Sequence, residues 1–524
     1  MTEKYYITTP IYYPSGKFHI GNTYTTLLAQ SLRNYARMQN KETYFLTGID
    51  EHGQKISEKA KEKGITVQEY VDTQANAAKK LWEELEVDYN IFMRTTNKFH
   101  EQTVQKIFEK LFAKGDIYKG QYSGKYCTPC ETFFAQTQLV DEKCPDCGRE
   151  VKEMKEEAYF FNMKKYVDKL IKYYDEHPDF IKPEYRKTEM INNFIKPGLE
   201  DLCVTRTSVK WGIPLLNEPN HTVYVWLDAL TNYITALGYM QEDDTKFQKL
   251  WPADMQVVGK DIARFHLVYW PIFLMALDLP LPKTIFVHNF IMMKDGKMSK
   301  SKGNVIYPEQ LSRKYGTDAL KYFLLREMPL SGDATFSPEG FVERYNFDLC
   351  NDLSNLLNRT ISMVNKYLSG KIDGYTGKVN EVDKEFEEYT LEKIDTISEK
   401  MDNIEIANSL AEIWTVVSRT NKYIDETAPW TLAKEGKDKE LKSAMYHLVE
   451  SLRKIAILIT PFMEKTANNI FRQIGIEDKN LKTLGSLKSF DLIKNLKVIE
   501  KGEPIFMRLN IDEEVECIKN MMKQ

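Results

Sequence analysis

The sequence predicts an α/β domain with a split parallel sheet, followed by an all-α helix bundle. Two segments, at about residues 5–46 and 255–290, each contain a strand, a helix and a second strand, which is the pattern of a parallel βαβ unit. After about residue 345 strand patterns fade and helical periodicity dominates. At 524 residues the chain is longer than one hydrophobic core usually supports, so several domains are expected.

The first βαβ unit begins with a β-rich run at residues 5–9, which Pro10 is expected to end. From Thr23 onward apolar residues recur at helical spacing, and residues 43–46 form the next apolar strand. This arrangement is typical of the start of a nucleotide-binding sheet.

The second βαβ unit joins strands at 255–258 and 284–290 through a helix at 262–277. The two units together predict a Rossmann-like parallel sheet. Because they lie far apart in the chain, the sheet must be split by an insertion, at about residues 119–222.

The helix bundle is predicted from apolar residues at helical spacing, beginning with the stripe formed by Leu349, Leu353 and Leu356. The last 40 residues are rich in lysine and only weakly patterned. The predicted helices of the bundle lie at about 349–363, 381–400, 406–424, 438–458 and 462–475.

The bulk composition rules out few classes of function. A net charge of −4 neither supports nor rules out a nucleic-acid partner, because a local basic face is sufficient for binding. The start of the chain does not have the pattern of a signal or transit peptide. The most apolar window, residues 265–279, is too short to span a bilayer and is interrupted by His266, Pro271 and Asp278. A cytoplasmic protein without a membrane partner is therefore expected.

Four of the seven cysteines form two CxxC pairs inside the insertion, Cys127 with Cys130 and Cys144 with Cys147. The spacing suits tetrahedral zinc, whereas the alternatives are free or disulfide-linked thiols. Four protein ligands would fill the coordination sphere, which indicates one structural Zn²⁺ per chain rather than a catalytic ion.

Two short motifs far apart in the chain carry the chemistry: His19-Ile20-Gly21-Asn22 and Lys297-Met298-Ser299-Lys300-Ser301. The first lies where a strand gives way to a helix, and free backbone N–H groups at that position suit a phosphate. The second is a basic run flanked by glycines, as expected of a loop that closes on a polyanion. In this order the two motifs resemble the nucleotide-binding signatures of class I aminoacyl-tRNA synthetases, and further residues narrow the resemblance to the methionyl-tRNA synthetase family.

The resemblance implies an ATP site in which His19, Asn22, Lys297 and Lys300 are catalytic. The fourth position of the first motif is usually histidine in the family, and Asn22 can donate a hydrogen bond there but carries no charge. Without the resemblance, a loop histidine beside a helix cap is the simpler interpretation of the first motif, and a solvated basic turn is an alternative for the second. The implied ATP-binding residues are His19, Gly21, Asn22, Asp261, Lys297, Ser299, Lys300 and Ser301.

The family's methionine pocket needs a carboxylate for the ammonium group and polarisable aromatic walls for the thioether. Asp50 follows the second predicted strand, at the edge of the sheet where ligands of such folds bind, and by resemblance it holds the ammonium. The alternative is that the aromatic residues simply belong to the core. The implied methionine-binding residues are Ile11, Tyr13, Asp50, Trp226, Ala229, Tyr233, Ile262, Phe265, His266 and Trp270.

Three residues of the bundle match the family's anticodon readers. Asn355 and Arg359 are spaced to share an exposed helix face, and Trp430 lies at a helix start behind a first-turn proline. Tryptophan can stack on an unpaired base while the polar pair bonds base edges. From the residues alone, a surface arginine and a partly buried tryptophan remain the simpler interpretation.

The resemblance implies ATP-dependent attachment of methionine to its tRNA through methionyl-adenylate, with Mg²⁺ accompanying ATP. Two alternatives are another class I synthetase for a small hydrophobic amino acid and a non-catalytic tRNA-binding paralogue. The insertion is too short for an editing domain, and neither motif is lost, so both are less favoured. A monomer is expected, because the chain is too short for the C-terminal dimerisation domain that bacterial relatives often carry.

The predicted division of the chain into domains is 1–118 and 223–325 for the catalytic halves, 119–222 for the connective insertion, 326–345 for a stem-contact linker, 346–480 for the anticodon-binding bundle and 481–524 for a C-terminal extension.

Overall fold

A computed structural model describes residues 3–14, 16–130, 132–134, 139–294, 296 and 304–523. The chain forms two compact units. The first unit contains Met1–Phe18 and Glu42–His288, and the second contains His19–Lys41 and Asn289–Gln524.

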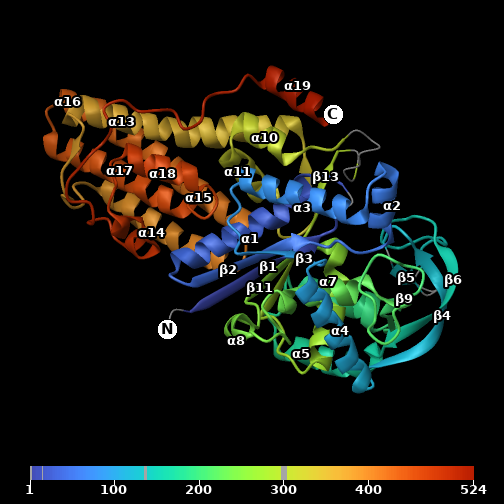
Figure 1. Cartoon of the computed structure of the whole chain (residues 1–524). Helices are drawn as coiled ribbons and strands as arrows, with labels where there is room; N and C mark the ends of the chain where they lie inside the picture. The colour runs from blue at the N-terminus through green and yellow to red at the C-terminus, as the bar shows by residue number, and fades with distance from the viewer. Residues whose placement is uncertain are drawn as a thin grey trace. The chain divides into compact units, whose positions relative to one another are not determined.

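The first unit is built on a six-stranded sheet in which every neighbouring pair is parallel (Figure 1). The strand order reverses direction between β1 and β11, the kind of switch point at which ligands of open α/β sheets bind. The predicted split parallel sheet is thereby confirmed. In spatial order the strands are β3 (Ile91–Arg94), β2 (Glu42–Ile49), β1 (Lys4–Tyr12), β11 (Met255–Gly259), β12 (Thr284–His288) and β7 (Ile181–Lys182).

Strand β1 is longer than predicted, because Pro10 does not end it. The pairing with β2 is continuous up to Thr8, shifts register, and resumes at Ile11 opposite Gly48. Proline has no N–H to donate, and the irregularity in the ladder falls where that donor is missing. The strand therefore runs on to Tyr12.

The predicted insertion contributes to the central sheet, which the sequence did not indicate. Its two-residue strand β7 pairs in parallel with β12 at the sheet edge. Four further strands of this region form a separate antiparallel sheet in the order β5 (Thr132–Phe134), β4 (Ile117–Cys127), β6 (Lys152–Phe161) and β8 (Leu202–Cys203). The short strands β9 (Thr205–Arg206) and β10 (Thr222–Val223) pair beside it.

The helix predicted at residues 262–277 is not one α-helix. A 3₁₀ turn covers Lys260–Ile262, residues 263–264 are α-helical, a π-helical segment covers Phe265–Tyr269, and α9 (Trp270–Ala276) continues as α-helix. Single π turns inside helices often mark functional positions, because they change which side chains share a face. The other helices of the first unit are α2 (Gln54–Lys63), α3 (Val67–Glu84), α4 (Lys98–Ala113), α5 (Val167–Glu176), α6 (Tyr185–Met190), α7 (Val225–Thr235) and α8 (Thr245–Leu250).

The second unit is mainly helical, and its bundle helices lie side by side (Figure 1). The predicted bundle is confirmed, although a π segment (Tyr345–Ser354) precedes α13 where one helix was expected. The bundle helices are α13 (Asn355–Leu368), α14 (Glu381–Asp402), α15 (Ile406–Thr427), α16 (Pro429–Lys434), α17 (Asp438–Ile459) and α18 (Glu464–Gln473). The unit also contains α1 (Ile20–Met38), α10 (Pro308–Tyr315), α11 (Thr317–Glu327) and α12 (Pro338–Arg344).

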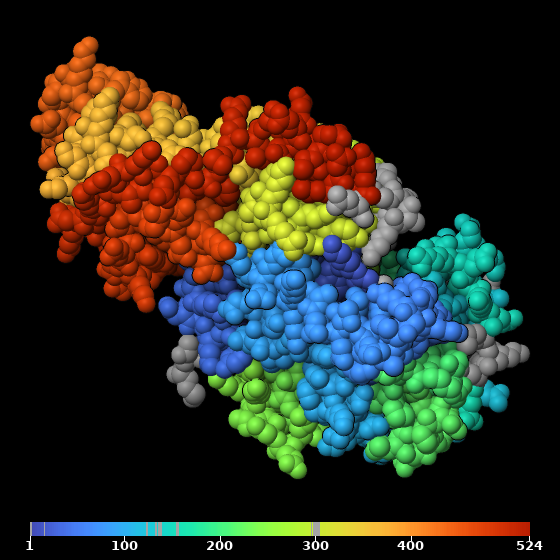
Figure 2. Space-filling model, turned by 45° about the horizontal axis from the view of Figure 1, so that its top comes forward, coloured from blue at the N-terminus to red at the C-terminus, as the bar shows by residue number. Residues whose placement is uncertain are grey.

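The weakly patterned C-terminal residues are structured against the second unit. Strand β16 (Leu496–Lys497) pairs with β15 (Lys371–Ile372), and α19 (Ile511–Met522) packs on α12. Figure 2 shows α19 in red against the yellow surface of this unit. Ion pairs from Lys314 to Glu514, at 2.6 Å, and from Lys519 to Glu339, at 2.8 Å, secure the helix.

Among the described residues, none of the helices combines the length and the apolar composition needed to cross a lipid bilayer.

Candidate functional site

An aromatic cluster forms where α7 meets the π segment Phe265–Tyr269. Trp226 of α7 stacks on Phe265, with ring centroids 3.4 Å apart and planes 9° from parallel. Ala229 lies one turn along α7, on the same face as Trp226. The ring N–H of Trp226 is buried and has no hydrogen-bond partner among the described residues. A buried donor of this kind calls for a partner that the described residues do not supply.

His266 and Tyr233 are joined by a hydrogen bond that fixes the protonation of the imidazole. His266 Nδ1 lies 3.0 Å from the carbonyl oxygen of Ile262, which can only accept, so Nδ1 carries the proton. Nε2 then accepts from the Tyr233 hydroxyl at 2.7 Å. Burial lowers the pKa of His266 to about 4, so the ring is neutral at neutral pH.

Trp270 backs this cluster from the core. It is fully buried, lies 5.7 Å from the ring of Tyr233, and donates to Gln256 Oε1 at 3.1 Å. Ile262 is half-buried and packs against the same core. The structure thus brings the predicted residues of α7 and of 262–270 together.

Asp50 lies directly after β2, at the carboxyl edge of the sheet, and is 7% exposed. Its N–H donates to the carbonyl of Tyr12 at 2.9 Å, which ties the Asp50 loop to the end of β1. Ile11 pairs with Gly48 in the same ladder, so it neighbours this loop. A side chain at Gly48 would lie 2.2 Å from the carbonyl oxygen of Met93, so only glycine lets β2 approach β3 this closely. A nearly buried carboxylate at this edge is suited to a cationic ligand group.

Tyr13, also predicted for the site, follows β1 and is half-buried. It packs with Trp211 against the hydrophobic cluster of α2 and α3. The ammonium of Lys55 lies 5.8 Å from the centre of its ring.

His19 is the N-cap residue of α1, and Asn22 completes the cap. His19 Nδ1 accepts from Gly21 N–H at 3.0 Å, and Asn22 Oδ1 accepts from His19 N–H at 3.2 Å. The proton of the neutral His19 ring is therefore on Nε2, where it can donate to a phosphate. A Cβ at Gly21 would lie only 2.8 Å from the His19 ring, so glycine is needed for this geometry. Asn22, which the sequence offered as a phosphate donor, thus also has a capping role.

The second motif, Lys297 to Ser301, lies outside the described residues. Before it, β13 (Ile291–Met293) pairs in parallel with β14 (Ala334–Phe336). Asp261, the remaining residue predicted to bind ATP, is exposed beyond the end of β11.

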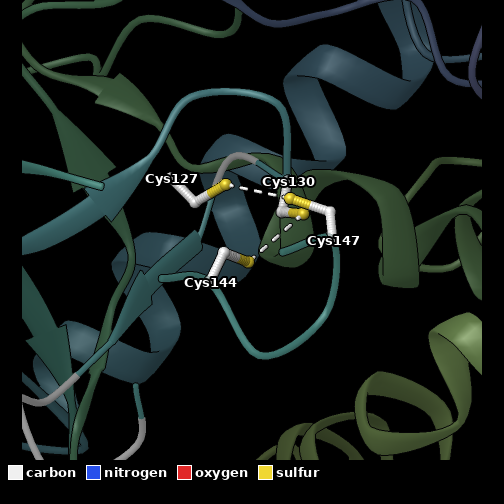
Figure 3. Close-up of side chains that lie close together, drawn as sticks. All are labelled: Cys127, Cys130, Cys144 and Cys147. Atoms are coloured by element: carbon white, nitrogen blue, oxygen red, sulfur yellow. Dashed lines mark hydrogen bonds between the residues drawn. The ribbon is translucent and has the colours of Figure 1, made fainter. Parts of the chain in front are cut away.

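The four predicted cysteines converge in the insertion (Figure 3). Cys127 Sγ lies 3.5 Å from Cys147 Sγ, and Cys144 Sγ lies 3.7 Å from Cys130 Sγ. A zinc ion bonded to four sulfurs at about 2.3 Å would separate them by about 3.8 Å, so the cluster has the right size. None of these cysteines is in a disulfide.

The electrostatics of the cluster also fit a cation. Burial raises the pKa of Cys127 to about 12, and the crowded neighbouring sulfurs add to the shift. Four adjacent thiols cannot all ionise without a positive charge among them, and a divalent ion provides one. The residues present therefore fit a structural Zn²⁺.

The three predicted anticodon readers lie in the second unit. Asn355 and Arg359 occupy adjacent turns of α13, with Asn355 exposed and Arg359 in an ion pair with Asp425 at 3.2 Å. Surface pairs of this kind contribute at most about 1 kcal/mol, so the guanidinium can exchange partners. Trp430, in the first turn of α16 after Pro429, is 47% exposed.

Sequence reasoning missed a buried group beside the aromatic cluster: His52, His100 and Asp228. Asp228 lies between the predicted site residues Trp226 and Ala229 of α7, and His52 follows Asp50 by two positions. Asp228 lies 176 positions after His52 and 128 positions after His100 in the chain, and no local spacing reveals such pairs.

Comparison with known proteins gives a consistent result. The family model for class I tRNA synthetases (M) matches residues 5–155 and 148–361, and the anticodon binding domain of methionyl tRNA ligase matches 374–521. The methionine–tRNA ligases of Bacillus subtilis and Enterococcus faecalis are each 54% identical, over 99% and 100% of this chain and 80% of their own length. A structure of Mycobacterium tuberculosis methionyl-tRNA synthetase with methionyl-adenylate superposes with a TM-score of 0.91, at 34% identity, over 97% of this chain and 100% of that one.

The chain belongs to the methionyl-tRNA synthetase family of class I aminoacyl-tRNA synthetases.

Proposed function

We propose that this protein joins methionine to its tRNA in two steps, with methionyl-adenylate as the intermediate. The observation that carries the proposal is the nearly buried carboxylate of Asp50 at the sheet edge, in the same unit as the aromatic cluster of Trp226 and Phe265. A carboxylate complements the ammonium of an amino acid, and polarisable rings complement a thioether. Family membership supports the same assignment.

In the first step a carboxylate oxygen of methionine bonds to the α-phosphorus of ATP, and the bond to pyrophosphate breaks. The attacking group is already ionised, so no general base is needed, and catalysis rests on positioning and charge stabilisation. His19 Nε2 and Asn22 would donate to phosphate oxygens at the start of α1. Lys297 and Lys300 would hold the β- and γ-phosphates, with Ser299 and Ser301 beside them.

The remaining site residues keep the roles that the sequence predicted. Asp261 would contact the ribose of ATP, and Mg²⁺ would neutralise the phosphates as ATP binds. The methionine side chain would contact Ile11, Tyr13, Ala229, Tyr233, Ile262, His266 and Trp270. In the second step a terminal hydroxyl of the tRNA displaces AMP, while Asn355, Arg359 and Trp430 would read the anticodon.

The cysteine cluster would hold one structural Zn²⁺ through Cys127, Cys130, Cys144 and Cys147. The ion would stabilise the insertion by linking two turns of chain and would take no part in the reaction.

The test is ATP-dependent charging of total tRNA with labelled methionine. We expect acid-precipitable methionine that disappears on mild alkaline hydrolysis, as an aminoacyl ester does. The proposal fails if the purified protein charges tRNA with a different amino acid or charges none.

A further inference from the structure

Three buried side chains from separate segments of the first unit meet at one carboxylate. Asp228 Oδ2 lies 2.6 Å from His52 Nδ1, and Asp228 Oδ1 lies 2.7 Å from His100 Nε2. Asp228 and His100 are fully buried and His52 is 3% exposed. We refer to these three residues as the His–Asp–His network.

Each oxygen of the Asp228 carboxylate accepts one hydrogen bond, because an ionised carboxylate has no proton to donate. His100 is fixed from its other side, where Nδ1 lies 2.6 Å from the hydroxyl of Thr235. A carboxylate at this depth is costly unless its charge is matched and its lone pairs are bonded. The network meets both conditions, so its geometry is strongly determined.

The network connects elements that carry different parts of the proposed substrate site. His52 belongs to the loop of Asp50, Asp228 belongs to the helix of Trp226 and Ala229, and His100 belongs to the adjacent helix α4. Binding sites lose affinity when such elements shift by even 1 Å. We propose that His52 and His100 are positioning residues that, through Asp228, hold α7 against the Asp50 loop and so set the affinity for the amino-acid substrate.

The charges of the network support this role. Burial opposes the charge on His52, but Asp228, with smaller contributions from Glu101 and Asp50, outweighs it and raises the pKa of His52 to about 10. Burial likewise opposes ionisation of Asp228, but His52 and His100 outweigh it and lower the pKa to about 2. The ion pair with His52 neutralises the buried charge of Asp228 within the network.

The inference rests on the proposed function. Amide substitutions can test it, because asparagine and glutamine place their N–H donors at different positions. Asparagine puts its N–H near the position of Nδ1, which His52 uses, and glutamine puts it near the position of Nε2, which His100 uses. His52→Asn and His100→Gln therefore keep the bond to Asp228, whereas His52→Gln and His100→Asn misplace it. The measurement is the KM for methionine and for ATP in ATP–pyrophosphate exchange.

We expect the misplaced amides, and Asp228→Asn, to raise the KM for methionine tenfold or more and to change the KM for ATP less than twofold. His100→Gln should stay within about threefold of the wild type. His52→Asn keeps the bond but removes the charge that neutralises Asp228, so its KM for methionine should lie between those of the wild type and His52→Gln. His447→Leu is the control, because His447 is a fully buried histidine bonded to a carboxylate, Glu387 at 2.9 Å, in the second unit. This control should leave the KM for methionine unchanged.

The inference is overturned if matched and misplaced amides give the same KM for methionine, or if the KM values for methionine and ATP rise together. Thermal melting of each variant identifies any that fails to fold, and the comparison within either amide pair still decides the question. If the wild type itself shows no methionine-dependent exchange, the proposed function fails instead.

Discussion

At the scale of single residues, His266 shows how burial sets the chemistry of the aromatic cluster. The ring donates to Ile262 and accepts from Tyr233, so a neutral imidazole satisfies both contacts. A second proton on Nε2 would place two donors against each other unless the Tyr233 hydroxyl turned away. The ring is therefore held in one tautomer over the physiological pH range.

This predicts a specific pH dependence of stability. The pKa of His266 is about 4 in the folded chain and about 6.5 when unfolded, so below pH 6.5 the unfolded chain binds a proton that the folded chain does not. The free energy of unfolding therefore decreases as the pH falls from about 6.5 towards 4. His266→Gln has no imidazole to titrate and so does not lose stability in this way. Its free energy of unfolding relative to wild type should therefore increase by roughly 2 kcal/mol when the pH is lowered from 7.5 to 5. Melting curves at both pH values measure the change, and a constant difference would refute it.

Lys300 is predicted to act on charge that develops in the transition state. Lys300→Ala should lower the rate of exchange far more than the affinity for methionine, and losing one such donor typically costs about 3 kcal/mol, or roughly 100-fold in rate. Lys294→Ala removes an exposed lysine just before the motif and serves as the control. Steady-state exchange kinetics distinguish the two variants. An unchanged turnover in Lys300→Ala would remove this lysine from the catalytic group.

At the scale of elements, the cysteine cluster was fully predictable from sequence, because CxxC pairs are local and their chemistry is specific. The structure adds that the two pairs meet with sulfur separations close to those of a tetrahedral site. The π segment at Phe265–Tyr269 was not predictable, because its apolar run also fits an α-helix.

The purified protein should contain one zinc ion per chain by elemental analysis. Cys127→Ser should lose the metal, because four-sulfur sites bind zinc with ~10–16 kcal/mol in small peptides and depend on every ligand. Cys203→Ser is the matched control, since Cys203 is buried in the same unit but lies outside the cluster. A protein without metal, with four titratable thiols at these positions, would exclude the site.

The exposed position of Trp430 on α16 predicts that a mutation there separates tRNA charging from methionine-dependent exchange. Trp430→Ala should reduce charging of tRNA tenfold or more and leave methionine-dependent exchange intact, because one lost base stack costs ~1–3 kcal/mol. Phe112→Ala is a control for loss of an aromatic ring of similar exposure, 49% against 47%, on α4 of the first unit. The ratio of the two activities is the measurement. A parallel fall in both would indicate that Trp430 supports folding, and no fall in either would place anticodon reading elsewhere.

At the scale of the whole molecule, the sequence predicted the parallel sheet, the insertion and the helix bundle, because each has a strong local pattern. It could not predict that β7, a strand of only two residues within the insertion, extends the central sheet, because so short a strand has no periodicity. It also placed Asp50 and the aromatic residues in one site without finding His52, Asp228 and His100. Those residues are recognised only when the fold brings distant segments together.

The central claim is that the chain activates methionine, and ATP–pyrophosphate exchange with each of the twenty amino acids tests it without tRNA. We expect exchange with methionine to be far faster than with any other amino acid. Discrimination by one methylene-sized group in a hydrophobic site is worth only ~1–3 kcal/mol, so homocysteine, added as a twenty-first substrate, should show weak exchange. Fast exchange with valine, leucine or cysteine, and none with methionine, would contradict the account.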